Sequence, residues 1–160
     1  MTYDIKLPKD LVKQKVDEQI TAILEQSLQP VSEGSETDIP CIELTQKVRS
    51  HIFYAGKTNH AVFGFDAIEQ NLVKELHGLE KMGTVPNRIS RLLIVSNDGS
   101  DRFYRQLEFV KKSHGQRVMF IKVDVDSDKL AQTLGLKGKK VKSVLITHKD
   151  SVCNILRQLI

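Results

Sequence analysis

Two short segments gather the side chains that could bind a polyanion. The first is Gly56-Lys57-Thr58-Asn59-His60. Its lysine supplies a positive charge, and the amide of Asn59 can pair with a nucleobase edge. We expect this segment to lie between a strand and the start of a helix, because the unpaired N–H groups and positive dipole end of a helix start attract phosphate. A plain capped turn is the simpler interpretation of the same residues.

The second segment is the run Leu136–Lys142, which follows Gly135. Its lysines are Lys137, Lys139, Lys140 and Lys142. A lysine-rich loop can follow a phosphate backbone, since each contact releases counterions; the alternative is a solvated loop without a ligand. Residues 1–50 hold six Lys/Arg and nine Asp/Glu, whereas residues 51–160 hold eighteen and eleven. The basic excess of the C-terminal part favours a polyanionic partner.

Other chemistries find little support in the sequence. The run Asp124-Val-Asp126-Ser-Asp128 resembles the opening of a calcium loop, but Lys129 and Gly135 stand where that loop needs Gly and Glu. The five histidines have no metal-ligand spacing, and the two cysteines, Cys41 and Cys153, form no CxxC pair. No combination of nucleophile, base and oxyanion hole appears. We therefore expect no catalysis, no metal and no cofactor.

The elements that must position both segments follow from the apolar pattern. Continuous apolar runs separated by helical segments indicate a buried sheet covered on both faces. We predict a three-layer α/β/α sandwich with a mixed sheet of about four strands and an N-terminal helical extension. The expected helices cover residues 9–28, 42–50, 58–73, 101–113, 127–134 and 150–159, the expected strands cover 52–55, 91–96, 118–123 and 142–147, and loops are expected at 30–40 and 78–87.

The predicted division of the chain places a helical arm and linker in residues 1–50 and an α/β domain in residues 51–160. The apolar stripe Leu11–Leu28 of the arm should contact a protein partner, cover the sheet, or fold back over the basic loops. The N-terminus lacks the apolar core of a signal peptide, and no apolar run approaches the ~20 residues that span a bilayer. We therefore expect a protein that is not secreted and has no membrane partner.

From Ile52 onward, the order of elements resembles that of the L7Ae family of kink-turn RNA-binding ribosomal proteins and their relatives. The resemblance covers about 100 residues. Its motifs are Gly56–His60, Leu92-Leu-Ile-Val-Ser96, Val118–Val123, Leu130-Ala-Gln-Thr-Leu-Gly135 and Ser143-Val-Leu-Ile146. The family pattern includes a strand and a Gly-x-Asn-Glu-type turn that opens a helix.

The resemblance implies RNA contacts for both segments. Asn59 would contact the sheared purine pairs of a kinked RNA, Lys57 would lie beside phosphates, and the loop Leu136–Val141 would approach the extruded nucleotide. This sequence departs from the family in having His60 where Glu is usual and a lysine-rich loop where small apolar residues are usual.

Within the family, the extra N-terminal helix resembles the eukaryotic protein subunit of ribonuclease P and ribonuclease MRP. That resemblance implies a non-catalytic RNA-binding subunit in tRNA and rRNA processing, with structured RNA and other ribonucleoprotein subunits as partners. It implies a nuclear, nucleolar location; otherwise we expect a cytoplasmic one.

Two alternatives come from other classes of protein. Met119–Asp126 followed by a helix and Val144-Leu-Ile146 looks like half of a thioredoxin fold. Because a redox thioredoxin needs CxxC, this alternative is a non-redox protein-binding module. The second alternative is a small enzyme that acts on a phosphorylated ligand bound at Gly56.

Overall fold

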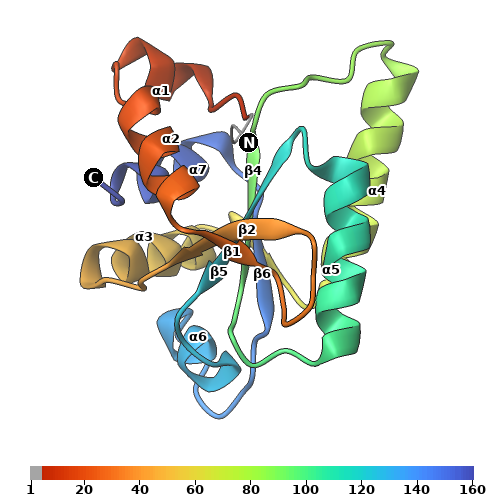
Figure 1. The fold of residues 1–160 in the computed structure, drawn as a ribbon. Coiled ribbons are helices and arrows are strands. Elements are labelled where there is room, and N and C mark those ends of the chain that lie inside the picture. The colour runs from red at the N-terminus through yellow and green to blue at the C-terminus, as the bar shows by residue number, and fades with distance from the viewer. Residues whose placement is uncertain (1–4) are drawn as a thin grey trace.

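The computed structural model describes residues 5–160, which form three layers around one sheet (Figure 1). The helices of this part are α1 (Lys9–Lys13), α2 (Asp17–Gln26), α3 (Gln46–Lys57), α4 (Phe65–Lys81), α5 (Asp101–His114), α6 (Ser127–Thr133) and α7 (Lys149–Arg157). The strands are β1 (Leu28–Pro30), β2 (Asp38–Ile42), β3 (Ala61–Phe63), β4 (Arg91–Val95), β5 (Val118–Val123) and β6 (Ser143–Ile146).

The sheet is mixed, with strand order β1-β2-β5-β4-β6-β3. Strands β2, β5 and β4 run parallel, so their carboxyl ends share one edge of the sheet. Strand β6 lies antiparallel to both β4 and β3, and β1 lies antiparallel to β2.

Alternation along the central strands divides the core into two halves. Leu92 and Ile94 of β4 pack with α3, α6 and α7, whereas Leu93 and Val95 pack with α4 and α5. All four side chains are almost fully buried, as expected for a strand covered on both faces. The predicted three-layer α/β/α sandwich with a mixed sheet is confirmed.

The strands expected at 91–96, 118–123 and 142–147 correspond to β4, β5 and β6, and the helices expected at 101–113, 127–134 and 150–159 correspond to α5, α6 and α7. The sheet has six strands rather than about four. Beside β4, β5 and β6 it contains three short strands that were not expected, β1, β2 and β3. Two of them, β1 and β2, form a hairpin where a loop over 30–40 was expected. Cross-strand pairing of Leu28 with Pro40 and of Pro30 with Asp38 holds this hairpin.

The strand predicted at 52–55 is wrong, because those residues belong to α3. The buried side chains Val48, Ile52 and Ala55 recur at helical spacing, so the short apolar run is part of an amphipathic helix. The helix predicted over 58–73 is also wrong at its start. Gly64, with φ at 85°, separates β3 from α4, which then continues to Lys81 through part of the expected 78–87 loop.

The N-terminal arm packs onto the body of the protein. Two helices replace the single one expected over 9–28, because the chain turns at Lys15, where φ is 62°. Leu11, Ile20 and Leu24 have no exposed surface and lie in the same apolar core as Ile52. Of the three possibilities for the arm, the structure therefore shows the one in which it covers the sheet. Helix α3 crosses the boundary expected at residue 50.

Within residues 5–160, no helix combines the length and the hydropathy needed to cross a bilayer.

Candidate nucleic-acid interface

The segment Gly56–His60 lies at the end of α3, not at the start of a helix. The N–H of His60 donates to the carbonyl of Ala55 (2.8 Å), and the N–H of Asn59 donates to the carbonyl of Gly56 (3.3 Å). Asn59 has a φ of 60°, so this is a Schellman end with asparagine in the left-handed position. The expected helix-start anion site at this segment is therefore wrong, because a helix end is the negative end of the dipole.

Two side chains of this segment already have partners. The Thr58 hydroxyl donates to the Tyr54 carbonyl at 2.9 Å. The His60 ring stacks on the His148 ring with centroids 4.0 Å apart, and its Nδ1 lies 2.9 Å from the Ser151 hydroxyl. His60 is thus turned toward the start of α7. Lys57 and Asn59 are the two residues of the segment whose side chains are exposed.

The second segment, Leu136–Lys142, begins directly after α6 and is hereafter the lysine loop. Gly135 ends α6 with a φ of 76°, the left-handed conformation that glycine commonly adopts at the end of a helix. The loop is fastened at both ends: Leu136 packs on the core, and buried Val141 donates its N–H to the Ser127 carbonyl at 3.0 Å. The residues from 137 to 140 are exposed, and so is Lys142.

The fold brings the two segments together. The ends of α3 and α6 are so close that a Cβ added to Gly135 would lie 3.2 Å from Cε2 of Phe53. A Cβ added to Gly56 would lie 3.6 Å from Cδ2 of Leu134 and 4.0 Å from Cζ of Phe63. Lys57 and the lysine loop therefore flank one stretch of surface.

Two exposed aromatic rings, those of Phe53 and Phe63, lie on this stretch, and Tyr54 adds a third exposed ring on α3 itself; the sequence did not indicate any of them. Phe53 is 40% exposed, Tyr54 is 61% exposed and Phe63 is 37% exposed. Nζ of Lys57 lies 5.4 Å from the centroid of the Phe53 ring. Assigning the apolar run 52–55 to a helix would have placed Phe53 and Tyr54 off its buried face.

We call this set of residues the lysine–aromatic surface. It comprises Phe53, Lys57, Phe63, Lys137, Lys139, Lys140 and Lys142.

A true strand-to-helix junction borders this surface at Gly64. The N–H of Gly64 donates to the Ser143 carbonyl next to the lysine loop (3.4 Å), and α4 begins without a side-chain cap. The junction reads Gly64-Phe65-Asp66-Ala67, so neither Asn nor Glu follows its glycine. The amide contact that the family resemblance implies at such a turn has no counterpart here.

The lysines of the surface have no acidic partner in residues 5–160. The ion pairs formed within residues 5–160 lie elsewhere: they join Glu75 of α4 to Arg91 and Arg117, at the amino ends of β4 and β5. Uncompensated positive charge beside exposed rings suits a polyanion whose bases can stack.

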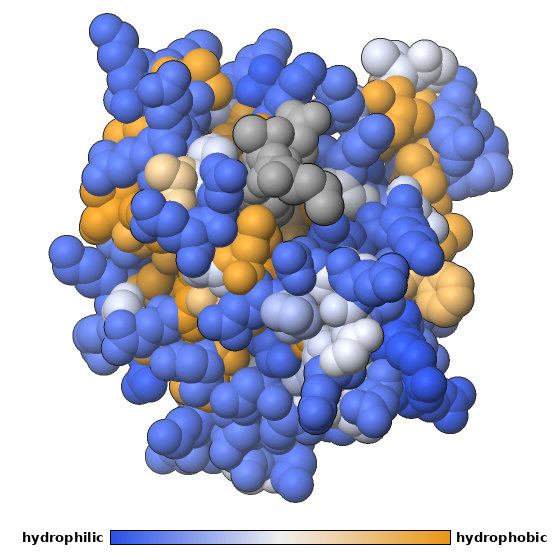
Figure 2. All heavy atoms as spheres, in the orientation of Figure 1, coloured by the Kyte–Doolittle hydropathy of each residue, from blue (hydrophilic) through white to orange (hydrophobic). Residues whose placement is uncertain are grey.

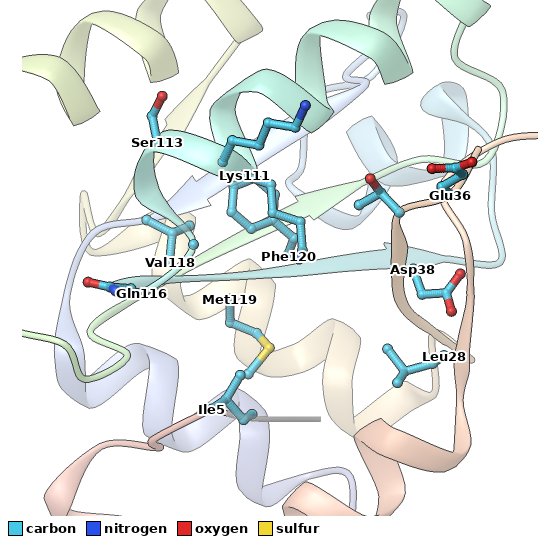
Figure 3. Close-up of a pocket in the computed structure, with 13 residues that line it drawn as sticks. Ile5, Leu28, Glu36, Asp38, Lys111, Ser113, Gln116, Val118, Met119 and Phe120 are labelled. Atoms are coloured by element: carbon cyan, nitrogen blue, oxygen red, sulfur yellow. The ribbon is translucent and has the colours of Figure 1, made fainter. Parts of the chain in front are cut away.

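The described cavities lie away from this surface. An open cavity of about 930 Å³ lies between the β1–β2 hairpin, the end of α5 and the first half of β5 (Figure 3). Glu36 and Asp38 lie on its hairpin side, opposite Lys111. A cavity of about 460 Å³ at the carboxyl ends of β2 and β5 is lined by Cys41, Lys122 and other residues. In the described part of the chain, no group of three His, Cys, Asp or Glu side chains could hold a metal.

Comparison with known proteins gives distant likenesses to solved structures. A Bacillus halodurans protein of unknown function has a TM-score of 0.48 and 17% identity, covering 72% of this chain and 98% of the other. The Giardia lamblia 15.5kD RNA binding protein has a TM-score of 0.43 and 13% identity, covering 72% of this chain and 83% of the other. No family model and no curated protein matches the sequence.

Proposed function

We propose that this protein binds structured RNA through the lysine–aromatic surface and does not itself catalyse a reaction. One observation carries the proposal: two basic segments that are far apart in the sequence meet at the ends of α3 and α6. Lys57 and Lys139 belong to different segments, yet the Phe53 ring beside Lys57 also lies against Gly135, the residue just before the lysine loop. Lysines contribute phosphate contacts, and exposed rings contribute stacking to unpaired bases.

The lysine loop is suited to phosphate because its ends are fixed while its charges stay free. Buried Val141 and the packed Leu136 hold the backbone, so little conformational entropy remains to be lost when RNA binds. Asp66 lies in the first turn of α4 beside this surface. Its negative charge disfavours phosphate at the start of that helix, which leaves the lysines as the main attraction.

The finer assignment rests on the L7Ae-family resemblance. It makes the protein a subunit of a ribonucleoprotein, with ribonuclease P and ribonuclease MRP as the proposed particles, kinked RNA as the ligand, other protein subunits as partners and the nucleolus as the location. Because the turn at Gly64 lacks Asn and Glu, we propose recognition of the shape and backbone of the RNA, with stacking in place of amide contacts to paired purines.

The test compares binding to an internal-loop RNA that kinks and to a plain duplex of equal length, over a salt titration. We expect tighter binding to the kinked RNA, with an affinity that falls as salt rises. Lys139→Ala/Lys140→Ala should weaken both complexes about tenfold and reduce the salt slope by about 2, since each lost phosphate contact removes about 0.9.

The matched control is Lys9→Ala/Lys13→Ala on α1, which removes the same charge from the opposite end of the molecule (Figure 1). The control should bind like the wild type. Equal losses from both double variants, or no binding by the wild type at low salt, would remove the lysine–aromatic surface as the RNA interface.

A further inference from the structure

Helix α5 carries a second basic stripe on its solvent face. Arg102, Arg105, Phe109 and Lys112 recur at spacings of three and four residues, so their side chains lie along one line. The buried residues of the helix, such as Leu107 and Val110, lie on the other side, against the sheet. From Arg102 to Lys112 the stripe spans ten residue-to-residue steps of helix, about 15 Å.

The stripe is free to contact a ligand. Arg102, Arg105 and Lys112 are exposed, and none of them forms an ion pair with another described residue. Phe109 is 69% exposed, with Nζ of Lys112 5.7 Å from its ring centroid. In Figure 2 the surface over the first half of α5 is strongly hydrophilic, and a small apolar patch interrupts it farther along the helix.

The first turn of α5, where the stripe starts, lies at the same end of the molecule as the lysine loop (Figure 1). The N–H of Ser96 donates to the Lys142 carbonyl at 2.9 Å, which joins the lysine loop to the chain that leads into α5. Arg102 follows six residues after Ser96, and both the loop after α6 and the start of α5 lie at the lower end in Figure 1. An extended ligand that continues from the lysine loop along α5 would therefore contact Arg102 first and Lys112 last.

The composition of the stripe favours a nucleic acid over a protein as its partner. The core of a protein–protein interface is depleted of charge and enriched in apolar side chains, whereas here one ring stands among Arg102, Arg105 and Lys112. Cations in line with an exposed ring suit a single nucleic-acid strand, which offers phosphates at intervals and unpaired bases for stacking.

We propose that the solvent face of α5 binds a single-stranded segment of the same RNA, continuing from the lysine loop. Arg102, Arg105 and Lys112 contact its phosphates, and Phe109 stacks on an unpaired base. This inference rests on the proposed function, because the structured part of the RNA must already be held by the lysine–aromatic surface.

The experiment uses three RNAs: the kinked core alone, the core with an unpaired pyrimidine extension of about 12 nucleotides, and the core with the same extension paired. The wild type should bind the unpaired extension about tenfold more tightly than the core alone. Arg102→Ala/Arg105→Ala should remove most of this gain and reduce the salt slope by about 1.4, because a contact to a single strand contributes about 0.7. Lys9→Ala/Lys13→Ala is again the matched control.

Phe109→Ala separates stacking from charge. It should weaken binding of the unpaired extension about fivefold, or about 1 kcal/mol, and leave binding of the paired extension unchanged. Because these side chains are exposed, the variants should keep the melting temperature of the wild type.

Binding of the core alone tests the proposed function, and the difference between extended and core RNA tests this inference. Equal affinity of the wild type for the core and the extended RNA would overturn the inference and leave the proposed function standing. The same conclusion would follow if Arg102→Ala/Arg105→Ala bound the extended RNA with the full gain of the wild type. Absence of core binding would overturn both.

Discussion

At the scale of single residues, Asn59 shows how one side chain can support two interpretations. The residue type predicts a contact between its amide and a base edge, whereas the structure gives its backbone the left-handed conformation that ends α3. Alanine is strained at positive φ and glycine is not. The alanine variant therefore combines a folding effect with any binding effect.

Substitution at Asn59 separates the two roles. We expect Asn59→Ala to lower the free energy of unfolding by about 1 kcal/mol and Asn59→Gly to leave it unchanged or slightly higher. If the amide also forms hydrogen bonds to a base, Asn59→Gly should weaken binding of the kinked RNA by about 1–3 kcal/mol and leave binding of the duplex unchanged. Urea denaturation and RNA titration of both variants provide the measurements. Wild-type affinity in Asn59→Gly would show that Asn59 serves only to end the helix.

At the scale of elements, the turn from α5 into β5 places a buried histidine beside a buried arginine. His114 is 7% exposed and Arg117 is 4% exposed, and the Arg117 N–H donates to the His114 carbonyl at 3.0 Å. Burial lowers the pKa of His114 below its ordinary value of 6.5, and the Arg117 guanidinium lowers it further, while Glu75 opposes both. The folded protein therefore favours the neutral imidazole.

The pH dependence of stability follows from this arrangement. A histidine with a depressed pKa stabilises the fold fully above its unfolded pKa, and this stabilisation is lost as pH falls through the folded pKa. We expect the melting temperature to decrease as pH is lowered from about 7 to 5, and His114→Gln to reduce that decrease. His77→Gln, at an exposed position of α4, should retain it. An unchanged pH profile in His114→Gln would assign the dependence to other groups.

The elements also differ in how far sequence could predict them. Strands β4, β5 and β6 are buried on both faces, so each is a continuous apolar run between turn residues. Helix α3 was predicted only in its first part, by the helix expected at 42–50, because the apolar run 52–55 was separated from a longer amphipathic pattern that starts at the Thr45 cap. The hairpin was missed because its turn region is rich in Pro, Ser and acidic residues, and its pairing depends on contacts between separate strands.

At the scale of the whole molecule, the sequence could indicate candidate binding residues but not where they meet in the fold. The lysine loop and Lys57 are visible as local charge. Their proximity depends on the packing of α3 against α6, which involves the contact between Phe53 and Gly135. Sequence spacing does not encode such a contact, so only the fold shows that the two segments meet.

The packing of α1 and α2 decides whether these helices fold with the rest of the chain. Leu24 of α2 has no exposed surface and belongs to the same core as Ile52 of α3 and Val144 of β6. Shared burial of this kind couples the elements, because none of them can leave without exposing the others. The structure therefore predicts one cooperative unfolding unit rather than an independent arm.

Leu24→Ala tests this coupling. Removing a fully buried leucine side chain should lower the free energy of unfolding of the whole molecule by about 3 kcal/mol, with a single urea transition of unchanged slope. Val12→Ala, at a residue that is 43% exposed on α1, should change it by less than about 0.5 kcal/mol. Circular dichroism and tyrosine fluorescence, which has no tryptophan signal to compete with it, should report the same midpoint. An early transition confined to Leu24→Ala would instead show that the arm unfolds by itself, with the α/β body left intact.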